Sequence, residues 1–167
     1  QVNTLRSAKA RVLQPASVAA LSPAQVTALR PAAVANLQAA AVAAMTGEQL
    51  EALRPAAVSR LTAQQLKTLS ADQITALDRD QLRSMRPVQF KWIRPATVAA
   101  LEPAQVRSLT RADVRRLRNA QIEALTPEQL SSMRLAQLRA MRNQQVQALS
   151  DEQVAALSPA ERRAFCI

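Results

Sequence analysis

The sequence has no histidine and no tyrosine, and it contains one glycine and one cysteine among its 167 residues. Histidine is the commonest general base and metal ligand, so its absence disfavours most catalytic and metal sites. A single glycine excludes a glycine-rich loop that would bind phosphate. Cys166 has no second cysteine for an internal disulfide and no candidate base that would activate its thiol. We therefore expect no catalytic residue, no metal ligand and no cofactor.

Long apolar runs are missing too: no stretch could span a bilayer, and the start does not resemble a signal peptide. Apolar residues make up 49% of the chain, yet many are alanine, and the only aromatic residues are Phe90, Trp92 and Phe165. The hydrophobic core must therefore be thin. Gln1 already fits the repeat described next, so we expect a fragment of a longer protein, whose localisation the missing signal does not decide.

What the chain does contain is an eight-residue repeat that runs without insertion from Val18 to Leu157. We label its positions a to h, with Leu130 at a and Met133 at d. Large apolar residues fill a and d in nearly every octad, and all nine prolines and the single glycine fall at f. An unpatterned sequence would scatter these residues over eight phases, so the pattern identifies a repeat array.

A period of eight does not suit one continuous helix, because eight residues turn through about 800° and the a/d stripe would drift around the rod. Prolines inside such a helix would each cost roughly 3 kcal/mol. We therefore predict an all-α solenoid, a superhelix of about two-turn helices that run from f to d and bend at e. The prediction treats residues 1–167 as one array, with imperfect end units at 1–14 and 158–167.

Each octad carries its own helix start, best seen at residues 125–133. Thr126 is a good N-cap, Pro127 occupies the first helical position, and Gln129 can close a capping box. We expect a and d to face the solenoid axis, small residues at c and g to let adjacent helices approach closely, and b and f to face solvent. Arginines at e recur at every third octad in places, and three helices per superhelical turn would stack those corners.

The formal net charge is +10, and basic residues are densest between Arg79 and Arg118. Two interpretations stay open: arginines at e bond exposed carbonyls at the helix ends, or the ridge binds an anionic partner. Trp92, at c, either packs in the core or stands partly exposed beside Lys91 and Arg94. The candidate binding residues are Arg83, Arg86, Lys91, Trp92, Arg94, Arg107, Arg111, Arg115 and Arg118.

The hexapeptides Leu-Thr-Pro-Glu-Gln-Leu (125–130), Leu-Ser-Pro-Ala-Gln-Val (21–26) and Leu-Glu-Pro-Ala-Gln-Val (101–106) resemble the Leu-Thr-Thr-Asp-Gln-Ile/Val-type octapeptide arrays of large bacterial secreted or surface proteins. The resemblance covers nearly the whole chain and implies a bacterial origin and a scaffold or interaction role. The same hexapeptide is similar to the start of the DNA-reading repeats of TAL effectors. Those repeats are far longer and carry a base-reading loop that this chain lacks, so no base-reading residue is carried over.

Three hypotheses for function follow. The first is a non-enzymatic helical-repeat scaffold or protein-interaction module, part of a larger bacterial protein of the secreted, effector or toxin type, with a protein partner. The second is a nucleic-acid-binding basic superhelix that uses the ridge from Arg79 to Arg118. The third, ranked last, is binding to an anionic membrane surface. Steep salt dependence would separate the second from the first.

Overall fold

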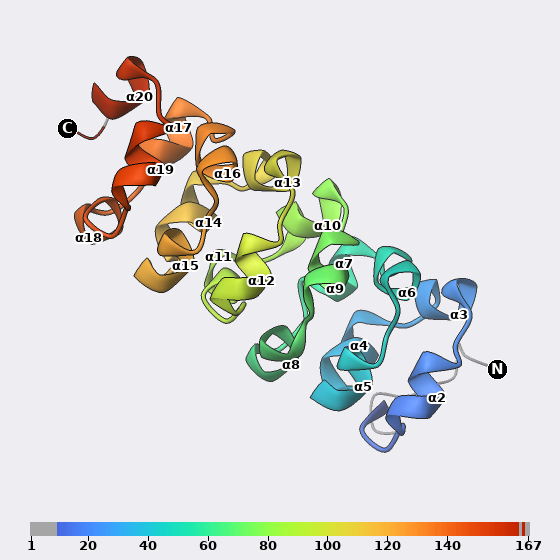
Figure 1. The fold of residues 1–167 in the computed structure, drawn as a ribbon. Coiled ribbons are helices and arrows are strands. Elements are labelled where there is room, and N and C mark those ends of the chain that lie inside the picture. The colour runs from blue at the N-terminus through green and yellow to red at the C-terminus, as the bar shows by residue number, and fades with distance from the viewer. Residues whose placement is uncertain (1–9, 164, 166–167) are drawn as a thin grey trace.

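The structure, a computed structural model, describes residues 10–163 and 165. Within them the chain forms nineteen short α-helices and no strand. The helices wind into an elongated rod, along which the chain advances from one end to the other (Figure 1). The predicted all-α solenoid of short helices is confirmed. The predicted end unit at residues 1–14 falls largely outside the described residues, and Cys166 lies outside them.

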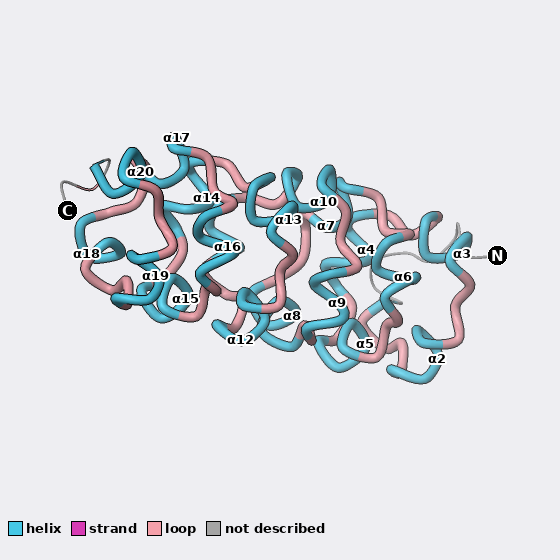
Figure 2. The backbone as a smooth tube through the Cα atoms, turned by 45° about the horizontal axis from the view of Figure 1, so that its top comes forward, coloured by secondary structure: helices cyan, strands magenta, loops and turns pink. Residues whose placement is uncertain are grey.

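The helices stack in three rows, because helices in contact across the turns are three apart in chain order. One superhelical turn therefore takes three octads, as the spacing of the corner arginines indicated. Figure 2 shows the tube turning at the short loops between helices.

By this spacing row 1 contains α2 (Pro15–Ala19), α5 (Ala39–Ala43), α8 (Ala63–Thr68), α11 (Pro87–Phe90), α14 (Arg111–Arg116), α17 (Leu135–Leu138) and α20 (Pro159–Arg163). Row 2 contains α3 (Pro23–Thr27), α6 (Gly47–Glu51), α9 (Ala71–Thr75), α12 (Pro95–Ala99), α15 (Asn119–Glu123) and α18 (Asn143–Val146). Row 3 contains α4 (Pro31–Asn36), α7 (Pro55–Val58), α10 (Arg79–Ser84), α13 (Pro103–Ser108), α16 (Pro127–Ser131) and α19 (Asp151–Ala155).

Each helix begins at f, directly after an extended residue at e. Thr126, before α16, has φ −70 and ψ 155, and its side chain accepts a hydrogen bond from the backbone N–H of Gln129. The helices are four to six residues long, shorter than the span from f to d that the sequence suggested. They end early because the N–H at d bonds to the carbonyl three residues back, as Met133 does to Leu130 at 3.1 Å. Such bonds tighten the last turn.

Positions a and d form one thin, continuous core along the rod, as predicted. Leu130 and Phe90, both at a, are fully buried, and Met133 at d is nearly so. The prediction for g is wrong, because alanines such as Ala56 are exposed. Position h is buried in its place. The reason is that a side chain at the third helical position points back across the helix start, toward the preceding turn.

The buried residue at h is usually glutamine, and its side chain joins consecutive turns. Gln81 Oε1 accepts the N–H of Asp78 at 2.9 Å, which closes the capping box within its own octad. Gln81 Nε2 donates to the carbonyls of Leu50 at 2.8 Å and Leu53 at 2.6 Å, which are the a and d residues one turn earlier. We call these contacts the glutamine ladder.

The ladder continues along the described residues with the same pair of acceptors at a and d. Its members are Gln49, Gln65, Gln73, Gln81, Gln89, Gln105, Gln121, Gln129, Gln137, Gln145 and Gln153. No buried side-chain nitrogen or oxygen lacks a partner in the described part of the chain. The ladder thus supplies a donor to the carbonyls at d, for which no backbone N–H is present, and a second donor to the carbonyls at a, which already accept the N–H at d.

Replacing Gln81 by methionine tests the ladder. Methionine keeps the length of the side chain but removes the acceptor of the Asp78 N–H and the donor to the Leu53 carbonyl. The Leu50 carbonyl loses one of its two donors and keeps the N–H of Leu53. We expect the free energy of unfolding to fall by about 2–4 kcal/mol, measured by urea unfolding. Gln64→Met is the matched control, since Gln64 is exposed at g of α8, and it should change stability by less than about 0.5 kcal/mol. Equal small effects of both substitutions would contradict the role of the ladder.

Candidate functional site

The rows differ in charge, which gives the rod one basic face. Among the octads of row 1 from α2 to α17, the only acidic residue is Asp113, and it is buried. The basic residues of these octads are Lys67, Arg86, Lys91, Arg111, Arg115, Arg116, Arg134 and Arg139. The exposed acidic residues between 46 and 157 lie instead in rows 2 and 3, at Glu48, Glu51, Asp72, Asp78, Asp80, Glu102, Glu123, Glu128, Asp151 and Glu152.

Four cations form a line along row 1, because each occupies position b and each follows the last by one full turn. They are Lys67, Lys91, Arg115 and Arg139. Packed helices lie about 8–10 Å apart, so the charges form a regular column that runs along the rod. We call this column and the other basic residues of row 1 the basic face.

Trp92 lies on the basic face, is half-buried and makes cation–π contacts with two lysines. Its ring packs against the core, and the ammonium groups of Lys67 and Lys91 lie 5.2 Å and 4.5 Å from the ring centroid. Contacts of this kind stabilise a structure by about 0.5–1 kcal/mol each at exposed sites. The two interpretations of Trp92 therefore both hold in part, because it packs on the core and is still partly exposed, with Lys91 over its ring.

The corner between rows 1 and 2 carries arginines whose side chains hold neighbouring turns together. Arg94, Arg118 and Arg142 each donate to the carbonyl 25 residues earlier, at distances of 2.9, 3.5 and 3.1 Å. The predicted bond from an arginine at e to a helix-end carbonyl is thus confirmed, and the carbonyl belongs to the preceding turn. Arg54, at the next corner, makes the same bond to the carbonyl of Leu29. These four arginines are anchored by part-buried hydrogen bonds, although each residue as a whole is exposed.

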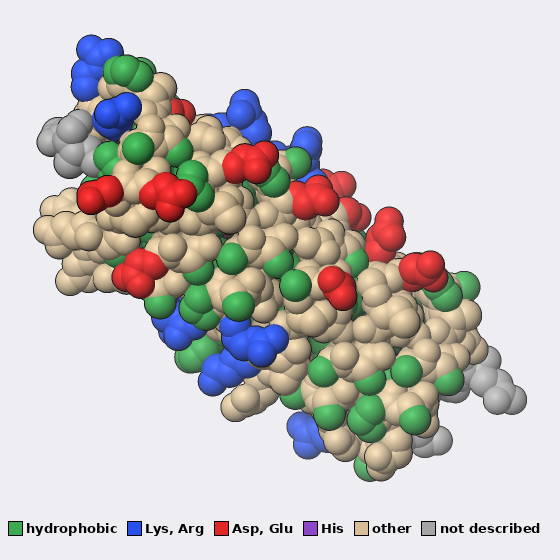
Figure 3. Space-filling model, in the orientation of Figure 1, with side chains coloured by type: hydrophobic (Ala, Val, Ile, Leu, Met, Phe, Trp, Pro, Cys, Tyr) green, Lys and Arg blue, Asp and Glu red, His purple; other side chains and the backbone are tan. Residues whose placement is uncertain are grey.

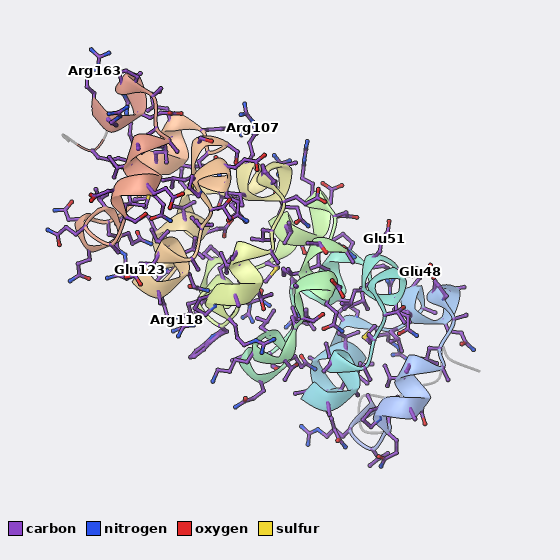
Figure 4. The ribbon with its side chains drawn as sticks, in the orientation of Figure 1. Glu48, Glu51, Arg107, Arg118, Glu123 and Arg163 are labelled. Carbon is purple, nitrogen blue, oxygen red and sulfur yellow. The ribbon has the colours of Figure 1, made fainter. Side chains whose placement is uncertain are left out.

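The structure divides the ridge that the sequence suggested. Arg86, Lys91, Trp92, Arg111 and Arg115 lie on row 1, and Arg94 and Arg118 lie at its edge. Arg83 and Arg107 lie on row 3, near acidic residues, because they belong to α10 and α13. Figure 4 shows Arg107 and Arg118 on opposite edges of the rod. In Figure 3 basic side chains gather at the lower edge, acidic side chains lie over the front, and both kinds occur along the upper edge.

Sequence reasoning missed the other basic residues of this face, namely Lys67, Arg116, Arg134 and Arg139. A window along the chain groups residues by proximity in sequence, whereas the face groups residues three octads apart. Aligning the octads in threes would have brought Lys67, Lys91, Arg115 and Arg139 into one column.

A shallow hollow of about 680 Å³ opens on the basic face between α14 and α17. Three small side chains, Ala112, Ala136 and Ala140, lie in it between three arginines. The lining residues are Thr110, Arg111, Ala112, Arg115, Ala136, Arg139 and Ala140. Small side chains and guanidinium groups together leave room for an anionic group to come within hydrogen-bond distance of several arginines.

Beside the hollow, Asp113 interrupts the glutamine ladder at position h of α14. Its Oδ2 accepts the N–H and the hydroxyl of Thr110, both at 2.7 Å, which completes the capping box. Burial raises the pKa of the Asp113 carboxyl above its ordinary value, while the hydrogen bonds from Thr110 act in the opposite direction. An ionised carboxylate has no hydrogen to donate to the preceding turn.

Metal-binding clusters and membrane-spanning helices are both absent from the described part of the chain. It holds no group of three or more histidine, cysteine, aspartate and glutamate side chains placed to bind a metal ion. None of its helices has the length and apolar character that crossing a membrane requires.

A comparison with protein-family models matches residues 98–135 to the family described as the ALTTAQ repeat. The matched segment covers α13 to α16 and the flanking residues, and it supports a repeat array of this kind there. No curated protein was found to match the chain.

Replacing Asp113 by glutamine should repair the ladder. The new amide can donate to the carbonyls of Leu82 and Met85, which lie 31 and 28 residues earlier as in the other rungs. We expect a gain of about 1–2 kcal/mol at pH 7, measured by urea unfolding.

The gain should depend on pH, because the pKa of Asp113 is raised in the folded state. Below its ordinary pKa of 3.8 the carboxyl is neutral in both states. As the pH rises from there, burial of the charge destabilises the native protein until the raised pKa is passed. The advantage of Asp113→Gln should therefore shrink toward pH 3. Asp80→Gln removes an exposed charge as the control, and a gain from Asp113→Gln that is the same at every pH would contradict the assignment.

Proposed function

We propose that this chain is a non-enzymatic helical-repeat interaction module that holds an extended macromolecular partner along one face. The observation that carries the proposal is the separation of charge by row, which recurs in the four successive turns of row 1 from α8 to α17. Side chains that recur at every third octad lie in a line and do not converge on one point. Such an arrangement suits contact with a long partner better than conversion of a small substrate.

The construction of the rod supports the same proposal. Every buried rung of the ladder fixes one turn against the next, so the faces keep their relative positions without a large core. A solenoid of this kind depends on contacts between neighbouring turns and offers an extended surface. The alanines of the outer positions leave the charged side chains as the main distinguishing features of each face.

The resemblance of the hexapeptides to bacterial octapeptide arrays and the ALTTAQ-repeat match at residues 98–135 support a place in a larger repeat protein. We propose a bacterial protein of the secreted or surface type as that parent. A protein partner is one candidate for such a module. The second candidate partner is a polyanion, which the positive charge of row 1 favours for that face.

Covalent labelling of arginine, lysine and carboxylate side chains tests the module. Labelling of the purified chain is compared with labelling of the same chain in a lysate of its native cells, followed by mass spectrometry. A partner held along one face should protect side chains at every third octad, within one row. Protection confined to a single turn would point to a localised site, and protection nowhere would contradict the proposal. The Gln64→Met protein serves as a control with an unchanged basic face.

A further inference from the structure

We propose that the basic face binds the phosphate backbone of duplex nucleic acid without reading its sequence. The inference rests on the proposed interaction module and names the partner of row 1. The face is defined by Lys67, Lys91, Arg115 and Arg139 in column, with Arg86, Arg111, Arg116 and Arg134 beside them.

Charge is the first support. The only acidic side chain of the row 1 octads up to α17 is Asp113, which is buried, so no exposed carboxylate competes for these cations within the row. The chain as a whole carries +10 and has a sequence pI near 11.6. A basic stripe on one face of a basic protein is the usual electrostatic footprint of nucleic-acid binding. Most of the cations are arginines, whose planar guanidinium groups bind phosphate in pairs of hydrogen bonds.

The apolar content of the face argues against the alternatives. Its only exposed large hydrophobic side chain among the described residues is Val88, at 39%. Stable protein interfaces depend on buried aromatic or aliphatic anchors, and membrane-surface binding depends on apolar side chains that insert. Trp92 is half-buried against the core and lies under two lysines. Single-stranded nucleic acid usually stacks on exposed aromatic rings, so a duplex is the better fit.

Spacing is the second support. Consecutive cations of the column are one turn apart, about 8–10 Å for packed helices. A duplex carries one negative charge for about every 1.7 Å of its axis, counting both strands. A cation every 8–10 Å along the rod therefore has phosphates within reach where either strand winds past the column.

The hollow between α14 and α17 supplies the closest approach. Ala112, Ala136 and Ala140 leave about 680 Å³ open between Arg111, Arg115 and Arg139, so phosphate oxygens can reach the guanidinium groups. The neutral side chains of this hollow are alanines and Thr110, which are too short to reach far into a groove. Contacts to phosphate position a duplex but carry no sequence information.

Binding is measured by fluorescence anisotropy with labelled 24-base-pair DNA duplexes of two unrelated sequences and an RNA duplex, over a series of salt concentrations. We expect dissociation constants of about 1–100 μM near physiological salt, with the two DNA sequences within about twofold of each other. Log affinity should fall against log salt with a slope of about −3 to −5. Comparing the RNA duplex with the DNA duplexes shows which of the two kinds of phosphate backbone the face binds more tightly. Emission from Trp92, the only tryptophan, should change when the face is occupied.

Two triple variants with the same loss of charge separate the basic face from net charge. Arg111→Gln, Arg115→Gln and Arg139→Gln together should weaken binding at least about tenfold and make the salt slope shallower by about 2.7, as three lost phosphate contacts require. Arg60→Gln, Arg79→Gln and Arg83→Gln together change row 3 and should stay within about twofold of the unchanged chain. Thermal unfolding of both variants confirms that each is folded.

Three results would overturn the inference. The first is no binding to either duplex at 50 mM salt, and the second is an equal loss of affinity in both triple variants. The third is binding of polyglutamate, or of vesicles that contain phosphatidylserine, as tight as binding of the duplexes, which would assign the face to an acidic protein or to a membrane. Each of these leaves the labelling experiment free to support or reject the interaction module independently.

Discussion

A helix of five residues has almost no hydrogen bonds of its own, and this chain contains little else. Such a helix can neither nucleate alone nor satisfy its terminal N–H and carbonyl groups. The buried glutamine at h meets both needs with one side chain, since its oxygen accepts the N–H before its own helix and its nitrogen donates to the turn before. The amide is neutral, so its burial does not carry the cost of a buried charge. Stability therefore accumulates between turns rather than within helices.

The surface follows from the same constraint. The rungs place each helix over the third helix before it, and this sets a period of three octads for everything on the outside. Residues that share a face are consequently distant in sequence, and neighbours in sequence lie on different faces. The separation of Arg107 from Arg118 is one result (Figure 4), and the column from Lys67 to Arg139 is the converse.

Local features were predictable from the sequence, and relations between turns mostly were not. The phase of a, d, e and f follows from helix caps, proline geometry and apolar spacing, all of which act within one octad. The sequence predicted only one of the two roles of Gln129. The capping box explains why its Oε1 accepts the N–H of Thr126, but it assigns no acceptor to its Nε2. The acceptors of that nitrogen lie one full turn earlier, at Val98 and Ala99 in α12 and at Leu101 just beyond it. The candidate surface shows the same limit, since it groups Arg83 and Arg107, which lie on row 3, with residues of row 1 that are close to them along the chain.

The acceptors of the ladder are main-chain carbonyls, and this has a consequence for how such arrays change over generations. A carbonyl is the same whichever residue carries it, so a rung does not depend on the identity of its neighbours. Duplication or loss of three octads by unequal recombination would insert or remove one full superhelical turn. Every row would then keep its alignment along the rod. Gain or loss of a single octad would rotate all later residues by one row. Where the residues on one face are under selection, related arrays should therefore differ in length by multiples of three octads.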